Sequence, residues 1–389
     1  MILVIQGHLP FEKSERRRLY EEWSRKTPTV FVHPDPARWT FRRLDSFFHY
    51  LDREVRFTGL SHLRFPSVIP GSRLGWITQA NRWMSMRKLL RWLKRHSKEP
   101  LVLVCQYPWV LPTFRGLPAD LTVYDVVDDY VSGLDGKGPN RRVRILHERF
   151  VRDSDVVWTT SETLAQQIRS LGAEPIETRH GVDWVLFAAA DDQGAAPEMT
   201  QIGYPKIGLV GRLNDRIDWS MILKICELHP EWNLVFIGPV YGGRGQTETT
   251  RRVLLEGARP ENLHHLPAVR PEEMPRYFVG LDVGLIPYRP TGANLSINPL
   301  KVYQFLATGI PVVATPIPSL VRLGEHVRIC STADEFANGI SQALAASQDT
   351  ASRRLRKDRV RTSDWASVAE FHLEILRDKL NERSTATRS

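Results

Sequence analysis

Short apolar runs alternate with amphipathic stretches along almost the whole chain. In the first half these runs are MILVIQG, PTVFVH, PLVLVCQ, LTVYDVVD and DVVWTTS. In the second half they are KIGLVGRL, WNLVFIGP, ENLHHLP, VGLIPY and PVVAT. Apolar runs of this length, bounded by turn residues and separated by helical stretches, are typical of strands buried on both faces. The pattern predicts an α/β fold with mainly parallel sheets.

A small, polar segment without periodicity divides the two sets of runs. This segment, AAADDQGAAPEMTQ at residues 188–201, is the best candidate for a linker. We therefore expect an N-terminal domain at residues 1–187 and a C-terminal domain at residues 202–363. A closing helix is expected at 364–380, followed by a disordered tail at 381–389. A length of 389 residues agrees with two domains of ordinary size.

The segment NPLKVYQFLATGIPVVATPIP, residues 298–318, predicts a helix, a turn and a strand. Asn298 suits an N-cap, and Pro299 suits the first helical position, where its missing N–H costs nothing. Gly309 can end the helix, and residues 312–314 read as a short buried strand. A helix N-terminus with Lys301 in its first turn can hold a phosphate or diphosphate. Taken alone, the segment favours an ordinary helix-to-strand step of a parallel sheet.

Other residues suited to phosphate follow the predicted strands. Gly211 and Arg212 come after IGLV, Gly238 comes after LVFI, and Tyr288 comes after GLIP. Glycine lets a phosphate or sugar approach the backbone, and arginine can donate two parallel hydrogen bonds to phosphate oxygens. Ligands of open α/β sheets bind at the carboxyl ends of the strands. These residues and the helix that starts near Asn298 are therefore expected to line one cleft.

The composition, 42% hydrophobic and 25% charged residues, is that of a globular protein. No apolar run is long enough to span a bilayer, and the N-terminus lacks the features of a secretory signal, so we expect a cytoplasmic protein. Cys105, Cys226 and Cys330 are far apart and are predicted to be buried thiols. Clusters of acids or histidines with metal-ligand spacing are also missing from the sequence, so no metal is expected.

The positive charge is concentrated in the first hundred residues, which carry 20 Lys and Arg against 9 Asp and Glu. It is densest in residues 81–98, which contain seven basic residues and no acidic one. Residues 76–98 also carry an apolar set, made up of Trp76, Ile77, Trp83, Met86, Leu90, Trp92 and Leu93. Such a helix could lie on an anionic membrane surface, or it could pack its apolar face into the core. The pattern fits both interpretations equally. Nucleic-acid binding is not expected, since no known binding motif accompanies the charge.

The second half of the chain resembles the C-terminal domain of the GT-B glycosyltransferases. The matching segments are RHGVDWVLF, IGLVGRLNDRID, WNLVFIGP, ENLHHLPAV, LDVGLIPY and NPLKVYQFLATGIPVVATP, in the family's order and spacing. The first half matches through LTVYDVVDDY and HERFVRDSDVVWTTSETLA. The resemblance implies two facing Rossmann-like domains, a C-terminal helix that returns to the N-terminal domain, and a sugar-nucleotide donor.

The sequence departs from the retaining family-4 enzymes, which place one Glu eight residues before another. Here the corresponding positions hold Ser296 and Gln304, so both carboxylates are absent. The Lys that often follows Gly-Arg-Leu is also missing, and Arg216 is the nearest basic residue. The combination of HGVD, Lys-x-x-Gln and an aspartate after a first-domain strand resembles instead the inverting glucuronosyltransferases of the xanthan type. The resemblance therefore implies inversion.

An inverting transfer needs a base for the acceptor hydroxyl and an electrophilic site for the departing nucleoside diphosphate. The resemblance and the position just after VYDVV indicate Asp128 as the base, with Asp125 and Asp129 as alternatives. His8, which follows the first predicted strand, is a further alternative ranked below Asp128. Lys301 would neutralise the diphosphate with the N–H groups that follow Asn298, and Arg212 would assist. Gln304, one turn after Lys301, suits ribose hydroxyls or a diphosphate edge.

The resemblance places further residues at the donor. Tyr288 would pack near the nucleotide, and His180 and Gly181 would lie where the chain turns close to the donor. Val269, at the end of ENLHHLPAV, would contact it as well. Enzymes of this fold use protein cations rather than a divalent ion, so neither a metal nor another cofactor is expected.

We therefore expect a glycosyltransferase that moves a sugar from a nucleoside-diphosphate sugar to a glycan or lipid-linked acceptor in polysaccharide biosynthesis. It would be cytoplasmic or peripheral on the inner face of the plasma membrane. The alternatives are a retaining transferase, a sugar-nucleotide 2-epimerase and a non-catalytic sugar-nucleotide-binding protein.

Overall fold

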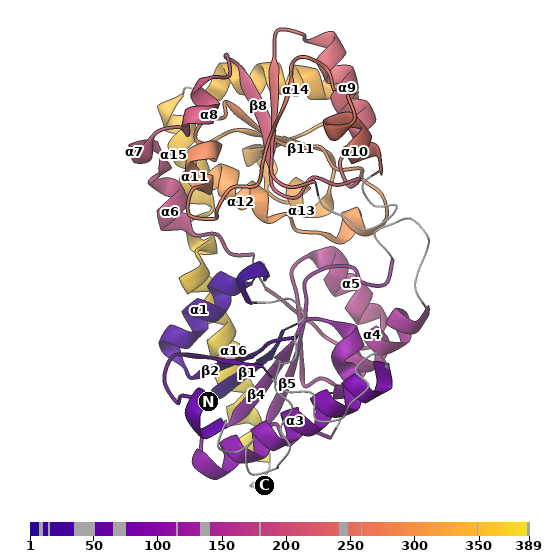
Figure 1. Cartoon of the computed structure of the whole chain (residues 1–389), viewed down its shortest axis with the longest axis vertical. Helices are drawn as coiled ribbons and strands as arrows, with labels where there is room; N and C mark the ends of the chain where they lie inside the picture. Colours follow the sequence, from indigo (N-terminus) through magenta and orange to yellow (C-terminus); the bar gives the residue numbers. More distant parts are fainter. Residues whose placement is uncertain are drawn as a thin grey trace. The chain divides into compact units, whose positions relative to one another are not determined.

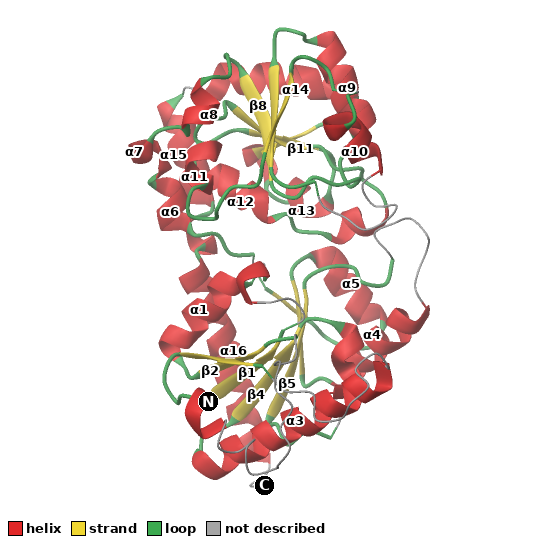
Figure 2. Ribbon diagram, in the orientation of Figure 1, coloured by secondary structure: helices red, strands yellow, loops and turns green. Residues whose placement is uncertain are grey.

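A computed structural model describes residues 1–7, 11–14, 16–34, 51–64, 75–113, 116–132, 141–178, 180–240, 248–257, 259–347 and 349–386. The chain divides into two compact units (Figure 1). The first unit comprises Met1–Val131, Pro139–Thr178 and Trp365–Ser389, and the second comprises Ser132–Gly138 and Arg179–Asp364. In each unit the strands run through the middle and helices surround them (Figure 2).

The described part of the first unit contains a parallel sheet with the strand order β3-β2-β1-β4-β5-β6-β7. Its strands are β1 (Ile2–Gln6), β2 (Thr29–Val32), β3 (Leu60–Leu63), β4 (Leu101–Cys105), β5 (Leu121–Val126), β6 (Val156–Thr159) and β7 (Ile176–Glu177). The central strands β1 and β4 are buried along their whole length, as expected for uninterrupted apolar runs. The five strands predicted in this half are confirmed, while the short edge strands β3 and β7 were not predicted.

The helices of the first unit pack around this sheet. They are α1 (Arg17–Lys26), α3 (Gly75–His96), α4 (Arg141–Asp153), α5 (Glu162–Ser170) and α16 (Trp365–Ala386), with 3₁₀ turns at Phe11–Lys13 and Pro108–Thr113. The C-terminal helix α16 returns to the first unit, as predicted, and lies against α1, where Lys26 pairs with Glu370 at 2.5 Å. The helix is longer than expected because residues 381–386, predicted as a disordered tail, continue it. Residues 387–389 lie outside the described residues.

The second unit contains a parallel sheet with the order β10-β9-β8-β11-β12-β13 in its described part. Its strands are β8 (Lys206–Val210), β9 (Asn233–Ile237), β10 (Leu263–Leu266), β11 (Val283–Ile286), β12 (Val312–Ala314) and β13 (Val327–Ile329). The five predicted strands are confirmed. The edge strand β13 was missed because it has only three residues, one of them the exposed Arg328.

The helices of the second unit include α6 (Trp184–Ala188), α7 (Ala190–Gln193), α8 (Pro197–Thr200), α9 (Trp219–Leu228), α10 (Glu248–Leu255), α11 (Met274–Phe278), α12 (Leu300–Ala307), α13 (Pro318–Val321), α14 (Ala333–Ser347) and α15 (Thr350–Arg359). Short 3₁₀ turns lie at Gly292–Ser296, Gly324–His326 and Arg361–Ser363. The first turn of α12 lies beyond β11, at the carboxyl edge of the sheet, and its far end leads into β12. The predicted helix, turn and strand therefore form as expected.

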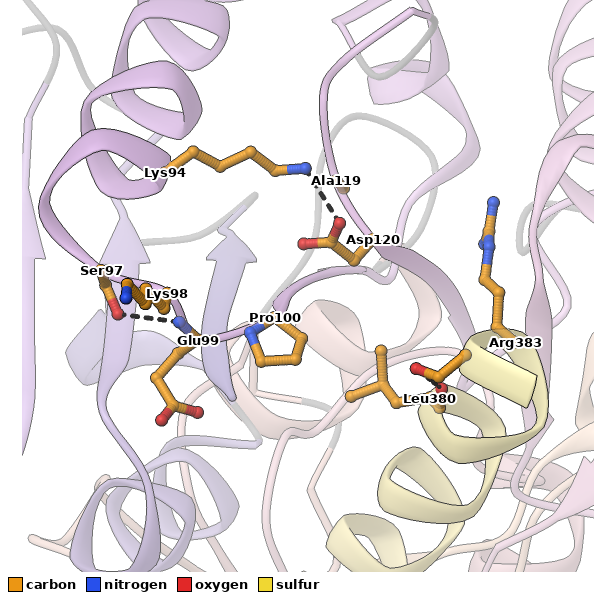
Figure 3. A pocket seen from close by; sticks show the side chains of 10 residues that line it. Lys94, Ser97, Lys98, Glu99, Pro100, Ala119, Asp120, Leu380 and Arg383 are labelled. Carbon is orange, nitrogen blue, oxygen red and sulfur yellow. Dashed lines mark hydrogen bonds and ion pairs between the residues drawn. The ribbon is translucent and has the colours of Figure 1, made fainter. Parts of the chain in front are cut away.

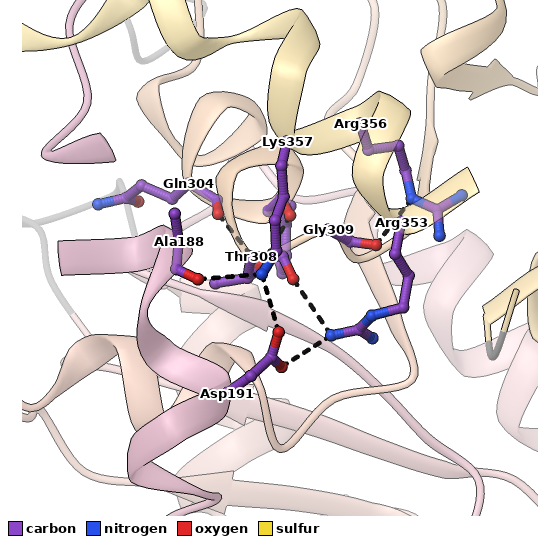
Figure 4. A network of polar contacts seen from close by, with 9 residues as sticks. Ala188, Asp191, Gln304, Thr308, Gly309, Arg353, Arg356 and Lys357 are labelled. Carbon is purple, nitrogen blue, oxygen red and sulfur yellow. Dashed lines mark hydrogen bonds and ion pairs between the residues drawn. The ribbon is translucent and has the colours of Figure 1, made fainter. Parts of the chain in front are cut away.

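Residues 188–201 do not form a linker. They contain α7 and α8, and Ala190, Ala196 and Met199 are buried in the second unit. Asp191 accepts hydrogen bonds at 2.8 Å from both Arg353 and Lys357 of α15 (Figure 4). The compact units divide between residues 178 and 179, so the expected boundary at 187 is also displaced. A polar, aperiodic segment resembles a linker in sequence even when a few small apolar side chains anchor it to a core.

The apolar residues of α3 pack inward. Met86, Leu90, Leu93 and Trp92 belong to the core of the first unit, and the Trp92 indole donates to Asp52 at 2.8 Å. Trp83 is half-buried, with the Arg87 guanidinium 4.9 Å from the centre of its ring. The core interpretation of this helix is therefore correct for Met86, Leu90, Trp92 and Leu93, whose buried side chains are not available to enter a membrane. The side chains of Trp76 and Ile77 are outside the described part. Within the described residues, no helix combines the length and apolarity needed to cross a membrane.

Candidate functional site

The backbones of two glycines lie in close contact at the carboxyl ends of neighbouring strands. Gly211 follows β8 and Gly238 follows β9, with φ angles of 136° and 140°. A Cβ atom on Gly238 would lie 1.9 Å from the Gly211 carbonyl oxygen, which no side chain could tolerate. Both positions therefore require glycine, because of backbone conformation and of space. Gly211 is half-buried and Gly238 is buried, and both lie at the strand ends where the sequence predicts a close approach to the backbone.

Lys301 lies against this glycine pair. A Cβ atom on Gly211 would lie 3.0 Å from Lys301 Nζ, so the ammonium group sits directly over the end of β8. The same Nζ lies within hydrogen-bonding distance of the Tyr288 hydroxyl and 5.0 Å from the centre of the Tyr288 ring. Tyr288 follows β11, the neighbour of β8 in the sheet, and is buried. The structure thus brings together Gly211, Gly238, Tyr288 and Lys301, as predicted from sequence.

The loops that follow β8 and β11 are bonded to each other, which fixes this arrangement. The Asp218 N–H donates to the Pro287 carbonyl at 2.7 Å, and the Arg289 N–H donates to the Arg216 carbonyl at 2.9 Å. The side-chain amide of Asn294 donates to the Arg289 carbonyl at 2.9 Å. Thr315, after β12, donates through its hydroxyl to the Tyr288 carbonyl. Sequence reasoning did not select Asn294 or Thr315, because both act by holding backbone and not through a charged or phosphate-suited side chain.

The beginning of α12 differs from the prediction. The helix begins at Leu300 with Pro299 as its N-cap, and no side chain caps it. The Asn298 Oδ1 atom instead accepts a hydrogen bond from the Tyr303 hydroxyl at 3.1 Å. The His180 ring lies 6.4 Å from the Tyr303 ring. Asn298 is therefore not the helix N-cap, and with His180 it lies around Tyr303, a residue that the sequence interpretation did not select.

The other predicted donor residues are dispersed around this edge. Gln304 is half-buried on α12, and its side chain points away from the Asp191 network (Figure 4). Arg212 is exposed next to Gly211, and Val269 is half-buried in the loop after β10. Gly181 is buried, and the next residue donates its N–H to the Ser363 carbonyl at 2.8 Å. His265 of β10 was missed, although its Nε2 lies 3.0 Å from the Gly238 carbonyl oxygen and donates to it.

The three candidate aspartates of the first unit have different environments. Asp125 lies within β5, is fully buried and pairs with Arg16 at 3.1 Å, so it is not placed to act as a base. Asp129 is buried and accepts from the Gln167 amide at 3.2 Å. Asp128 is half-buried just beyond the carboxyl end of β5, and its Oδ1 accepts the Asp129 N–H at 2.9 Å. Asp128 is the most accessible of the three.

The first unit contains a cavity of about 570 Å³, which does not lie at the carboxyl edge of its sheet (Figure 3). Pro100 and Asp120, which line it, directly precede β4 and β5, so the cavity lies at the amino ends of these strands. Two of its basic side chains are already paired, Lys94 with Asp120 at 2.9 Å and Arg383 with Asp155 at 2.8 Å. Its position and paired charges do not suit a sugar nucleotide.

Comparisons with known proteins agree with this geometry. Residues 204–346 match the family model described as glycosyl transferases group 1. A Bacillus subtilis (strain 168) protein described as a teichuronic acid biosynthesis glycosyltransferase, TuaH, is 25% identical over 278 residues, 65% of this chain and 68% of that protein.

Solved structures share the fold across both units. Sucrose-phosphate synthase from Thermosynechococcus elongatus has a TM-score of 0.71 at 15% identity and covers 97% of this chain and 98% of its own. Anabaena Alr3699/HepE in complex with UDP-glucose has a TM-score of 0.68 at 13% identity, with coverage of 97% and 100%. Each of the two α/β units contains a parallel sheet, and the second unit contains a group 1 glycosyl transferase domain. The protein is therefore a glycosyltransferase of the GT-B fold.

Proposed function

We propose that the protein transfers a sugar from a UDP-sugar to a glycan or lipid-linked acceptor in the synthesis of a bacterial polysaccharide, with inversion at the anomeric carbon. The contact of Lys301 Nζ with the glycine at the end of β8 carries this proposal. A cation in the first turn of α12 supports the proposal, because charge and the N–H groups of a helix N-terminus together bind phosphates. The choice of UDP and of a polysaccharide product follows the similarity to UDP-glucose-bound HepE and to TuaH.

Inversion is proposed because the chain lacks carboxylates where retaining family-4 enzymes carry them. Ser296 is buried in the 3₁₀ turn before α12, and Gln304 is an uncharged amide on that helix. A single displacement needs instead a base on the acceptor hydroxyl, and protein cations can neutralise the leaving diphosphate without a metal. The anomeric configuration of the product, determined by NMR, separates inverting from retaining transfer. Conversion of the donor without any acceptor would indicate an epimerase.

Lys301→Ala is expected to weaken UDP binding about 10- to 100-fold, because a charge-assisted contact to phosphate contributes about 1.5–3 kcal/mol. Isothermal titration calorimetry with UDP measures this effect. Lys301→Met keeps the apolar stem of the side chain and should fold normally with the same loss. Lys224→Ala, which removes an exposed lysine of α9, is the matched control and should bind UDP like the wild type. If Lys301→Ala bound UDP as tightly as the Lys224→Ala control, the proposed donor site would be wrong.

We also propose that the protein attaches to an anionic membrane surface, where a lipid-linked acceptor would lie. The attachment would be electrostatic, through exposed basic side chains. Arg91, Arg95 and Lys98 near the end of α3 are exposed, while the apolar side of the helix is buried. Each basic residue near such a surface contributes about 1 kcal/mol, so attachment would be reversible and sensitive to salt.

Arg91→Glu with Arg95→Glu is expected to abolish co-sedimentation with anionic vesicles at low salt, by reversing two of these charges. The control reverses two exposed charges of the second unit, Arg251→Glu with Arg354→Glu, and should leave sedimentation unchanged. If the wild type ignores anionic vesicles, or if the α3 variant binds them equally well, the membrane proposal is wrong.

A further inference from the structure

The second unit contains a cavity of about 260 Å³ at the opposite edge of its sheet from Lys301. Pro311 and His326, which line it, directly precede β12 and β13, so the cavity lies at the amino ends of these strands. Arg328, Gln342, Ser352 and Arg356 also line it. The glycines and Lys301 lie at the carboxyl ends, so this cavity is separate from the proposed donor site.

Arg356 of α15 brings an unsatisfied positive charge to this cavity. Its side chain is 8% exposed, and its Nε donates to the Gly309 carbonyl at 2.7 Å. Its Nη2 is buried without a hydrogen-bond acceptor among the described residues. The neighbouring Arg353 and Lys357 converge on Asp191, whereas Arg356 does not (Figure 4). A buried guanidinium with an unused donor is costly, and an anion is the ligand that relieves this cost.

Charged groups of both signs, Arg353 and Asp349, lie near Arg356. Burial lowers the pKa of Arg356 and the nearby Arg353 lowers it further, while Asp349 opposes them. Burial also lowers the pKa of His326, with Arg359 contributing in the same direction. The cavity is lined by two arginines, Arg328 and Arg356, and Glu325 is the one carboxylate among its described lining residues. The lining thus carries a net positive charge.

Arg328 reaches the cavity across a glycine within α14. A Cβ atom on Gly339 would lie 2.9 Å from Arg328 Cδ and 2.8 Å from Cys330 Sγ. Glycine inside a helix costs about 1 kcal/mol relative to alanine, and here its missing side chain makes room for the arginine stem. Gln342, one turn further along α14, also lines the cavity, and its Nε2 donates one hydrogen bond to Asn338 at 3.2 Å, which leaves its second N–H for a ligand. Two arginines and neutral donors from three elements therefore surround one small space.

We propose that this cavity binds a phosphate group, either inorganic phosphate or the phosphoryl group of a small metabolite. A tetrahedral dianion can accept from the free Nη2 of Arg356, from the Arg328 guanidinium and from the Gln342 amide through separate oxygens in fixed directions, which a spherical chloride ion lacks. The volume exceeds that of one phosphate ion and leaves room for a small organic group. The site does not depend on the proposed transfer reaction, because none of its residues belongs to the donor edge.

Calorimetry with inorganic phosphate, at ionic strength matched with chloride, tests this site. The chain used carries Lys301→Met, which removes phosphate binding at the donor edge, so the result is independent of the UDP experiment. Saturable binding is expected, and Arg328→Gln should weaken it about tenfold or more. Arg328 is exposed on an edge strand, so this variant should fold. Arg354→Gln, on α15 but outside the cavity, should bind phosphate with unchanged affinity.

Glucose 6-phosphate in the same titration distinguishes the two sources of the phosphate group. Tighter binding than inorganic phosphate supports a metabolite, and weaker binding supports the free ion. The proposal is overturned if the Lys301→Met chain shows no saturable binding at millimolar phosphate, or if Arg328→Gln binds as well as its parent. Binding that appears only after Glu325→Gln would also overturn it, because Glu325 would then be the natural partner of Arg356.

Discussion

Asp125→Ala is expected to lower the free energy of unfolding by about 3–5 kcal/mol, the usual cost of breaking a buried ion pair from one side. Arg16 and Asp125 are 2% and 0% exposed and join α1 to the middle of the first sheet. The other Asp125 oxygen accepts from the Gln106 amide at 2.9 Å. Removing the carboxylate would therefore leave a guanidinium and an amide buried together without an acceptor.

His372, a neighbour of Arg16, does not replace the lost carboxylate. Arg16 Nε and Nη1 already have no acceptor in the described structure, so Asp125 is the partner on which the guanidinium depends. His372 of α16, stacked on Trp158 at 4.3 Å between ring centres, is fully buried. Burial and the positive charge of Arg16 hold the pKa of His372 well below its ordinary value, and neither the neutral nor the protonated ring carries the negative charge that Arg16 needs.

Urea unfolding of the full chain, followed by circular dichroism, measures this loss. Glu370→Ala, which breaks the exposed pair with Lys26, should cost less than about 1 kcal/mol and serves as the control. The double variant Arg16→Met with Asp125→Leu should recover most of the stability, because apolar side chains of similar size replace buried ion pairs well. A loss below about 1 kcal/mol for Asp125→Ala would show that the pair is not a structural requirement.

The fold was predictable because its strands are buried on both faces. A strand such as LVLVC at 101–105 has no polar position, so it is identified by its apolar run and its length alone. The same property placed the site residues, since a residue that directly follows a buried parallel strand must lie at the carboxyl edge. This is why Gly211, Gly238 and Tyr288 could be grouped before their contacts were known.

Predictions failed where a side-chain contact competes with the local sequence pattern. Asn298 is a residue type that favours the N-cap position. Its side-chain oxygen instead accepts a hydrogen bond from the Tyr303 hydroxyl, and the helix begins at Leu300. The segment around Asp191 is polar like a linker, yet Arg353 and Lys357, more than 160 residues away, bind it. The Arg16–Asp125 pair spans 109 residues and leaves no sequence signal. The pair removes Asp125 from the candidate bases and leaves Asp128, with Asp129 as the alternative.

Asp128→Asn is expected to reduce sugar transfer about 10²- to 10⁴-fold while leaving UDP binding and stability close to wild type. Asparagine has the same shape and can still accept the Asp129 N–H that Asp128 Oδ1 accepts at 2.9 Å, so the local backbone should not change. What it loses is the ability to take a proton from the acceptor hydroxyl. The initial rate of UDP release in the presence of acceptor measures the effect, and calorimetry with UDP measures donor binding.

The variants of Asp125 and Asp129 make the Asp128 test specific to a base. Asp125→Asn should lower stability, because the buried Arg16 loses its counter-charge, and any loss of activity should follow the unfolded fraction. Asp129→Asn keeps an acceptor for the Gln167 amide and should retain most of the transfer rate. If Asp128→Asn is as active as the wild type and Asp129→Asn is inactive, the base is Asp129. Loss of UDP binding with Asp128→Asn would instead indicate a role in holding the donor, because a base acts on the acceptor and should leave donor affinity unchanged.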